Sequence, residues 1–299
     1  MFAKLLPAFA LLLAGCAATA SPVPAPAASE AMKNFATSCE DWDEWDKPAQ
    51  PFKVYGNTYY VGTCGITALL ITGPEGHVLI DTGTEPGARD VVENIAELGF
   101  KIEDIAVLTH SHEHFDHVGG FAYAKQLGTM KVAVARAAAE AFRTGNSDPA
   151  DPQHGTLPPM APVEVSREID DGDVIRVGSV GLTALAMPGH TPGALSWTWQ
   201  ECDDGKVCRT IVYADSLSPV SADDYHFSDH PTYLADYRAS LAKLAKLDCD
   251  ILLTPHPSAS DMISRAANGS FEGGMSCKDY AAAVTKRLDD RLAKEATAK

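Results

Sequence analysis

Hydrophobic residues recur with two different periods along the chain, and these periods divide it into strands and helices. Residues 59–72 are rich in β-branched and aromatic side chains, GPEG at 73–76 forms a turn, and residues 77–83 are apolar again, which predicts a β-hairpin. Further short apolar runs predict strands over 105–109, 131–135, 174–177, 180–186, 194–200, 208–214 and 251–253. Apolar residues that recur every three or four positions predict helices over 91–98, 121–127, 231–247 and 277–295.

The order of these elements favours one α/β domain over residues 37–299. Two runs of strands, each accompanied by helices, predict two sheets packed face to face with helices outside, a four-layer αββα sandwich. Residues 143–162 are rich in Gly, Pro, Asp and Asn and predict a long loop. Loops of this length are usually functional or mobile, so we expect Gln153, His154 and Leu157 to border a substrate groove.

The N-terminal residues follow neither period. Lys4 precedes an apolar run, Leu5–Leu13, that is too short to span a bilayer, and this is typical of a secretory signal peptide over residues 1–15. Residues 16–36 are rich in Ala, Pro and Ser and predict a flexible tether.

The end of this signal predicts where the mature protein resides. Leu13-Ala14-Gly15-Cys16 resembles the lipobox of bacterial lipoproteins, in which the cysteine is acylated, so we expect Cys16 to anchor the protein to the outer membrane, facing the periplasm. The alternative is cleavage near Ala20, which releases a soluble periplasmic protein. Apart from such an anchor, we expect no contact with a membrane.

Charge narrows the choice of partners. The chain has 24 basic and 40 acidic residues, a formal net charge of −16. A basic stripe of the kind that binds nucleic acid is missing from the sequence, so we expect no nucleic acid and a small-molecule substrate. We also expect a monomer. An anionic substrate needs a local positive centre, which bound metal supplies.

The cysteines also indicate export. Setting Cys16 aside leaves six cysteines, an even number that favours disulfides with fifteen alternative pairings. Cys202 and Cys208 flank Asp203-Asp204-Gly205, a hairpin-turn signal, so that pair is geometrically plausible. Free buried thiols are the alternative.

The sequence HSHEHFDH at 110–117 is a candidate metal site. Side chains two residues apart in an extended chain share a face, so His112 and His114 can bind one ion together. Asp116 and His117 lie where the chain turns into a helix and suit a second ion, about 3.5–4 Å from the first. We expect His110 to be structural.

Two isolated histidines complete the predicted ligand set. His190 lies in the turn MPGHTPG and His256 lies in LTPHP, each flanked by proline after a predicted strand. A lone histidine is more often a hydrogen-bonded structural residue, but these two supply the missing ligand of each ion. Glu113 points opposite to its neighbours, and we expect no ligand role for it.

Together these motifs resemble the metallo-β-lactamase superfamily, whose fold is an αββα sandwich with metal at one sheet edge. HSHEHFDH, PGHTPG, Asp81-Thr82-Gly83 and TPHP carry the resemblance, over roughly residues 50–260. YADSLS at 213–218, together with the Cys277-Lys278-x-Tyr280 helix, is similar to the third subclass of class B β-lactamases.

The resemblance implies a function and a cofactor. It implies a β-lactamase that confers antibiotic resistance, hydrolysing the lactam amide of penicillins, cephalosporins and carbapenems with a zinc-bound hydroxide, since zinc lowers the pKa of bound water to about 7. Two Zn²⁺ are expected, one on His112, His114 and His190 and one on Asp116, His117 and His256. Asp116 and His256 are the expected catalytic residues.

The resemblance also assigns substrate contacts and disulfides. It implies that Ser216 and Ser218 meet the substrate carboxylate. The implied disulfides are Cys39–Cys64, Cys202–Cys208 and Cys249–Cys277. Asp215 remains open, because an Asp that bridges the two metals indicates a lactonase or thioesterase, whereas an Asp that supports a ligand indicates a lactamase; we favour the latter.

Overall fold

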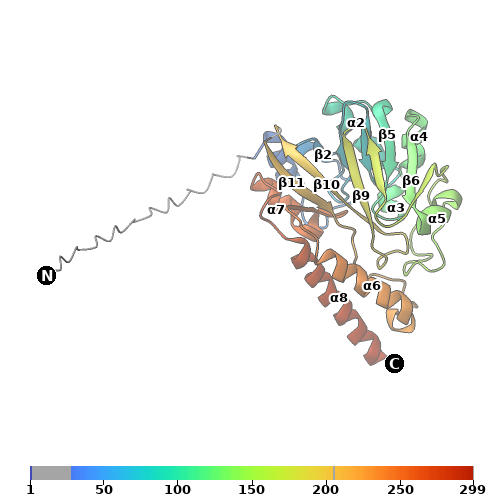
Figure 1. Cartoon of the computed structure of the whole chain (residues 1–299). Helices are drawn as coiled ribbons and strands as arrows, with labels where there is room; N and C mark the ends of the chain where they lie inside the picture. The colour runs from blue at the N-terminus through green and yellow to red at the C-terminus, as the bar shows by residue number, and fades with distance from the viewer. Residues whose placement is uncertain (2–27, 205, 299) are drawn as a thin grey trace.

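The computed structural model of the chain describes Met1, residues 28–204 and residues 206–298. Its strands form two sheets, with helices on the outer side of each (Figure 1). The expected signal peptide, Cys16 and most of the expected tether lie outside the described residues.

The first sheet has seven strands in sequence order, antiparallel from β1 to β4 and parallel from β4 to β7. They are β1 (Phe52–Tyr55), β2 (Thr58–Tyr60), β3 (Leu69–Ile71), β4 (His77–Ile80), β5 (Ile105–Thr109), β6 (Lys131–Ala135) and β7 (Arg167–Ile169). The connecting helices are α2 (Gly87–Glu97), α3 (Phe115–Val118), α4 (Phe121–Leu127) and α5 (Ala139–Thr144). Parallel strands bring their carboxyl ends to one edge, where β5 delivers the histidine cluster.

The second sheet has five strands in the order β12-β11-β10-β9-β8, with β11 and β12 parallel. They are β8 (Val174–Val177), β9 (Val180–Ala186), β10 (Leu195–Asp203), β11 (Val207–Tyr213) and β12 (Ile251–Leu253). The remaining helices are α1 (Glu30–Ser38), α6 (Pro231–Leu244), α7 (Met262–Ala267) and α8 (Cys277–Ala298). Short 3₁₀ turns occur at Ile102–Asp104, Arg136–Ala138, Phe227–Asp229 and Pro257–Ser260.

Alternation along the strands explains the layers. In β11, Ile211 and Tyr213 face the core shared with the first sheet, whereas Val212 faces a second core beneath α6 and α8. Tyr237 of α6 and Val284 of α8 pack into this second core. Because successive side chains of a strand point to opposite faces, one sheet holds both cores together. The predicted αββα sandwich is confirmed.

The predicted strand over 59–72 is wrong as a single element. It is divided into β2 and β3 by a tight loop over 61–68, in which the Thr63 amide donates to Ile66 O at 2.9 Å. Cys64 in this loop is bonded to Cys39, and the backbone of Gly62 lies too close to Ala68 to leave room for a side chain. Propensity favoured a continuous strand here, but the disulfide and the close backbone packing form a loop instead.

The expected tether extends less far than residue 36. Residues 30–38 form α1, whose first turn is capped by the Ser29 hydroxyl accepting from the Met32 amide at 3.1 Å. Phe35 of this helix is fully buried, with its ring 5.1 Å from Phe52 and 5.0 Å from Tyr60. Burial of this aromatic side chain makes the segment part of the domain. Among the described residues, no helix is both long enough and apolar enough to cross a bilayer.

Candidate metal centre

The histidine cluster lies where β5 ends, and Asp81 at the end of β4 fixes its backbone. Asp81 Oδ1 accepts from the Ser111 amide at 2.7 Å, and the Tyr213 hydroxyl donates to Oδ2 at 2.7 Å. Asp81 has a φ of 64°, a left-handed conformation that is uncommon outside glycine. Burial raises the pKa of this carboxyl to about 6. Asp81 therefore positions the segment that carries the candidate ligands.

Three histidines form the first group of candidate ligands. Nitrogens of His112, His114 and His190 all lie within 4.8 Å of one another, and all three side chains are buried. His112 and His114 leave β5 on one face, as their spacing predicts, and the turn after β9 brings His190 against them. This geometry fits a three-histidine metal site, with a fourth position open.

The second group shares its space with the first. Asp116 and His117 of α3 form a cluster with His112 whose donor atoms again lie within 4.8 Å. His256 comes from the segment after β12, and its Nε2 lies 3.6 Å from Asp116 Oδ2. The rings of His117 and His256 are 4.9 Å apart. The structure thus brings together all six side chains that the sequence selected, and their role as ligands stays a prediction.

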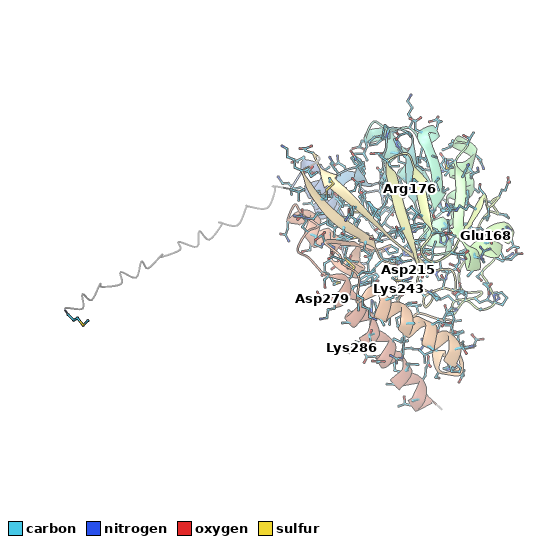
Figure 2. All side chains as sticks on the ribbon, viewed as in Figure 1. Glu168, Arg176, Asp215, Lys243, Asp279 and Lys286 are labelled. Carbon is cyan, nitrogen blue, oxygen red and sulfur yellow. A yellow bond between two sulfur atoms is a disulfide. The ribbon has the colours of Figure 1, made fainter. Side chains whose placement is uncertain are left out.

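Four of these histidines are oriented by an oxygen behind the ring. His112 Nδ1 is 2.8 Å from Asp215 Oδ1, and His114 Nε2 is 2.9 Å from Asp151 Oδ2. Behind the other two rings the oxygen is a backbone carbonyl. Ser218 O lies 2.9 Å from His190 Nδ1, and Gly65 O lies 3.2 Å from His256 Nδ1. Metal-binding imidazoles typically have such a partner, because it fixes the tautomer and leaves the other nitrogen for the ion. Figure 2 shows Asp215 where the strands of the second sheet end beside α6.

The inward-facing nitrogens support the same interpretation. His112 Nε2 and His117 Nδ1 are buried and have no hydrogen-bond partner in the described part of the chain, and His117 Nε2 faces the Asp116 carboxylate at 3.1 Å. Buried polar atoms are normally paired, so a cluster of unpaired ones requires an explanation. Imidazole nitrogens beside a carboxylate are the donors that zinc prefers, and the residues therefore fit a metal site.

The pKa values of His112, His190, His256 and Asp116 agree with a role as metal ligands. Burial, with the neighbouring histidines, lowers the pKa of His112 well below its usual value, and burial lowers that of His190 to about 3 and that of His256 to about 4. For Asp116, burial raises the pKa, but the nearby imidazoles outweigh it and hold the carboxyl below its usual range. Neutral imidazoles and an ionised carboxylate are the forms that bind metal, so these four residues are held in those forms. For His114 and His117, burial lowers the pKa, but the carboxylates of Asp151 and Asp116 outweigh it and raise the pKa above its usual value.

Glu113 has a structural role that the sequence did not reveal. Its carboxylate is buried and accepts from the Thr191 hydroxyl at 2.7 Å and from the Gly193 amide at 2.9 Å. These two donors belong to the turn that carries His190. Glu113 points away from the histidines, as expected, and it connects the two segments that supply the first ligand group.

Replacing Glu113 with Ala is expected to destabilise the fold. The Thr191 and Gly193 donors would be left buried without a partner, so we expect the free energy of unfolding to fall by about 2 kcal/mol or more. Urea unfolding followed by circular dichroism measures this. Glu113→Gln, which keeps one acceptor oxygen, should lose less, and equal losses in the two variants would contradict this role.

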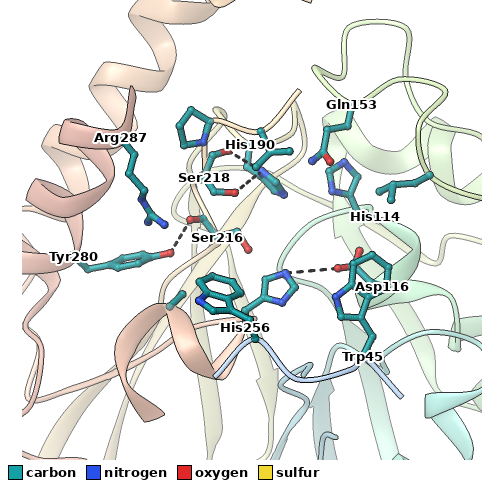
Figure 3. A pocket seen from close by; sticks show the side chains of 15 residues that line it. Trp45, His114, Asp116, Gln153, His190, Ser216, Ser218, His256, Tyr280 and Arg287 are labelled. Carbon is teal, nitrogen blue, oxygen red and sulfur yellow. Dashed lines mark hydrogen bonds and ion pairs between the residues drawn. The ribbon is translucent and has the colours of Figure 1, made fainter. Parts of the chain in front are cut away.

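A pocket opens over the metal centre (Figure 3). Ser216 and Ser218, the expected substrate contacts, both line it, and so do Gln153 and Leu157 of the 143–162 loop. His154 is instead hydrogen-bonded to Ser147 in that loop and is not among the lining residues. Ser216 Oγ is buried and has no partner among the described residues.

Several residues at this site were missed by the sequence analysis. Trp42 and Trp45, from the segment after α1, line the pocket with exposed fractions of 65% and 41%. Asp151 orients His114, and Arg287 of α8 lines the far side. The one available signal in the sequence was that Trp42 and Trp45 lie among acidic residues at 40–46, a context that is unusual for side chains that are mostly buried. His110 is structural, as expected: the Ala135 amide donates to its Nε2 at 2.9 Å.

The cysteines are joined as the resemblance implied. The structure contains disulfides Cys39–Cys64, Cys202–Cys208 and Cys249–Cys277. Cys249–Cys277 fixes the first residue of α8, the helix that carries Tyr280 and Arg287 to the pocket.

Comparisons with known proteins identify the family. The chain is 52% identical to the MIM-2 metallo-beta-lactamase, with 90% of this chain and 99% of that one covered at a TM-score of 0.85. It is also 41% identical to MEM-A1, a subclass B3 metallo-beta-lactamase isolated from a soil metagenome library. That match covers 86% of this chain and 100% of the other, at a TM-score of 0.82.

Curated relatives are more distant. A hydroxyacylglutathione hydrolase of Rhodopseudomonas palustris (strain BisB5) is 28% identical over 168 residues, covering 56% of this chain and 53% of that protein. The chain thus spans about half the length of such curated relatives. The family model for the metallo-beta-lactamase superfamily matches residues 61–256, which include every candidate ligand. The chain belongs to the metallo-beta-lactamase superfamily.

Proposed function

We propose that this protein is a zinc-dependent β-lactamase that hydrolyses the lactam amide of penicillins, cephalosporins and carbapenems. The observation that carries the proposal is the orientation of Asp215. Its Oδ1 is 2.8 Å from His112 Nδ1, and its Oδ2 accepts from the Leu217 amide at 3.1 Å. Both oxygens are thus engaged behind the ligands, which argues against a carboxylate that bridges two ions as a thioesterase or lactonase would require.

Similarity to known proteins also favours a β-lactamase over a thioesterase or lactonase. The solved relatives of highest identity named above are metallo-beta-lactamases matched over almost their whole length, whereas the hydroxyacylglutathione hydrolase matches over about half. Lactonase or thioesterase activity remains the second candidate, and the hydroxyacylglutathione hydrolase among the curated relatives supports the thioesterase.

Asp215→Ala tests the orienting role. Without the carboxylate, His112 loses its partner, and we expect metal affinity to fall about 10- to 100-fold, as for other residues that orient a ligand. Competition with a chromogenic chelator measures this. Asp215→Asn keeps an acceptor for His112 and should lose less. If Asn were as damaging as Ala and a whole metal equivalent were lost, Asp215 would be a ligand.

Two Zn²⁺ per chain are proposed, on the two groups of donors. Bound zinc supplies a water of lowered pKa, about 7, and a Lewis acid for the substrate carbonyl. Metal analysis of the purified protein, with its mass by sedimentation, tests the stoichiometry and the proposed monomer.

The protein's own residues position the reactants. Asp116 is the one carboxylate among the described residues that line the pocket, and its lowered pKa keeps it ionised. It can accept a hydrogen bond from the attacking water and hold that water toward the lactam carbonyl. His256 lies at its side, with Nε2 3.6 Å from Asp116 Oδ2, and limits where that carboxylate can point.

The pocket walls suit a β-lactam. Trp42, Trp45 and Leu157 offer an apolar surface to a side group of the substrate. Ser216 presents an unpaired hydroxyl for the substrate carboxylate. Ser218 is less free, since its Oγ is 3.3 Å and its carbonyl oxygen 2.9 Å from His190 Nδ1.

Hydrolysis of a chromogenic cephalosporin tests the proposal. We expect turnover by the zinc-loaded protein, loss of turnover on treatment with a chelator, and recovery on adding zinc. A thioester of glutathione and a simple lactone serve as rival substrates. Turnover of either rival with none of any penicillin, cephalosporin or carbapenem would reject the β-lactamase proposal.

We also propose export to the periplasm with acylation of Cys16 and attachment to the outer membrane. Three disulfides support export, because such bonds persist in oxidising compartments. Cell fractionation with labelled fatty acid distinguishes the two forms. Cys16→Ala should release the protein from the membrane fraction, and no label on the unaltered protein would favour cleavage near Ala20.

A further inference from the structure

Arg287 of α8 lacks an acidic partner among the described residues, whereas two cations close to it on the helix have one. Its neighbours on the helix are paired, Lys286 with Asp290 at 2.6 Å and Arg291 with Glu295 at 2.9 Å. No ion pair joins Arg287 to a carboxylate of the described residues, and its buried Nε has no hydrogen-bond partner there. Arg287 has a hydrogen bond with the Tyr280 side chain but no counter-charge. A partly buried guanidinium without a counter-charge is costly to keep unless it serves a ligand.

The place of Arg287 indicates what that ligand is. Among the described residues that line the pocket, it is the single Lys or Arg. Figure 3 shows it extending from α8 toward Ser216 and Tyr280, on the wall opposite His114 and Asp116. The Tyr280 hydroxyl donates to Ser216 O at 2.6 Å, so α8 and the segment that carries Ser216 form one wall of the pocket.

We propose that Arg287 binds the carboxylate of the β-lactam substrate, together with Ser216 Oγ, and thereby directs the lactam ring toward the metal centre. This inference rests on the proposed β-lactamase function. A guanidinium offers two parallel N–H donors that match a carboxylate, and such charge-assisted pairs are stronger than neutral hydrogen bonds. In a chain with a net charge of −16, a local cation adds to the positive charge of bound metal in attracting an anionic substrate.

The assignment changes the expected roles of the two serines. In the described part of the chain, Ser216 Oγ and Arg287 Nε are the two buried side-chain polar atoms of the pocket lining that have no hydrogen-bond partner. Ser218 is already engaged with His190. The carboxylate is therefore held by Arg287 and Ser216, and Ser218 acts mainly by orienting His190.

A pair of substrates isolates the charge contact. A chromogenic cephalosporin and its methyl ester share the same lactam ring, but the ester carries no carboxylate. For Arg287→Ala, we expect kcat/KM for the acid to fall about 10- to 100-fold, mainly through KM, because that is the contribution of a hydrogen bond to a charged group. For the ester, kcat/KM should change by less than about twofold, because the ester has no carboxylate for Arg287 to bind.

Matched variants separate recognition from folding. Lys286→Ala removes the same charge one residue away, on the exposed side of α8 (Figure 2), and should leave both substrates unaffected. Arg287→Lys keeps the charge and should recover part of the loss for the acid. Arg287→Met keeps the packing against Tyr280 and replaces the Ala variant if that one does not fold.

The outcomes are distinct. An equal loss for acid and ester would show that Arg287 acts only through Tyr280 and would overturn the inference, as would no loss for the acid. Wild-type protein that hydrolyses neither acid nor ester would instead reject the proposed function and this inference with it. A loss confined to the acid supports the inference.

Discussion

Asp116→Ala is expected to reduce kcat/KM for a chromogenic cephalosporin by about 1000-fold or more, while the protein remains folded. Removal of a residue that only orients a ligand lowers activity about 10- to 100-fold, and loss of the correct position of a reactant costs about 100-fold. Asp116 is expected to combine a ligand's role with that of a hydrogen-bond acceptor that positions the attacking water. Its Oδ2 lies 3.1 Å from His117 Nε2 and 3.6 Å from His256 Nε2, so its loss also removes the counter-charge of the second group.

The variant should also bind one metal fewer. We expect the zinc content to fall from the proposed two to one per chain, since the first group of His112, His114 and His190 is unchanged. Asp116→Asn preserves the shape but not the charge and tests whether the anion matters. Asp224→Ala, which removes an exposed carboxylate from a loop, is the control. Full metal content with activity within tenfold of wild type would contradict the assignment.

The six candidate ligands could be selected from sequence because each depends on local backbone. His112 and His114 follow β5 at a spacing of two, and Asp116 and His117 open α3. His190 and His256 lie in proline-flanked turns directly after strands. Short-range geometry of this kind is visible in the chain itself.

The partners behind the ligands were not predictable, because they come from segments distant in sequence. Asp151 reaches His114 from the long loop, and the carbonyl of Gly65 reaches His256 across 191 residues. Arg287 and Trp42 meet at the pocket from nearly opposite ends of the chain. Only tertiary packing determines such contacts.

The prediction of secondary structure failed where the same pattern of apolar residues suits both a strand and a loop. The apolar run 59–72 resembles a continuous strand, but the Cys39–Cys64 bond holds its middle as a loop. The pairing is invisible in composition, since fifteen pairings are open to six cysteines. α1 was assigned to the tether because Pro and Ala dominate just before it, although Met32 and Phe35 already show helical spacing.

Loss of the Cys249–Cys277 disulfide is expected to have the largest effect on stability. The cysteines are 28 residues apart, and the chain-entropy model gives about 3–4 kcal/mol for a loop of that length. Cys277 is fully buried and begins α8, which contributes Tyr280, Val284 and Leu288 to the core against the second sheet. We therefore expect the double Ser variant to unfold at lower urea concentration.

The hairpin disulfide provides a matched control. Cys202 and Cys208 are 6 residues apart on β10 and β11, so their double Ser variant should lose only about 2 kcal/mol in the same model. The two variants should also differ in activity. Freeing the start of α8 loosens Tyr280, which donates to Ser216 O at 2.6 Å, so KM for the cephalosporin should rise in the Cys249/Cys277 variant only. Equal stability losses, or an unchanged KM in both variants, would mean that α8 is held by core packing rather than by its disulfide.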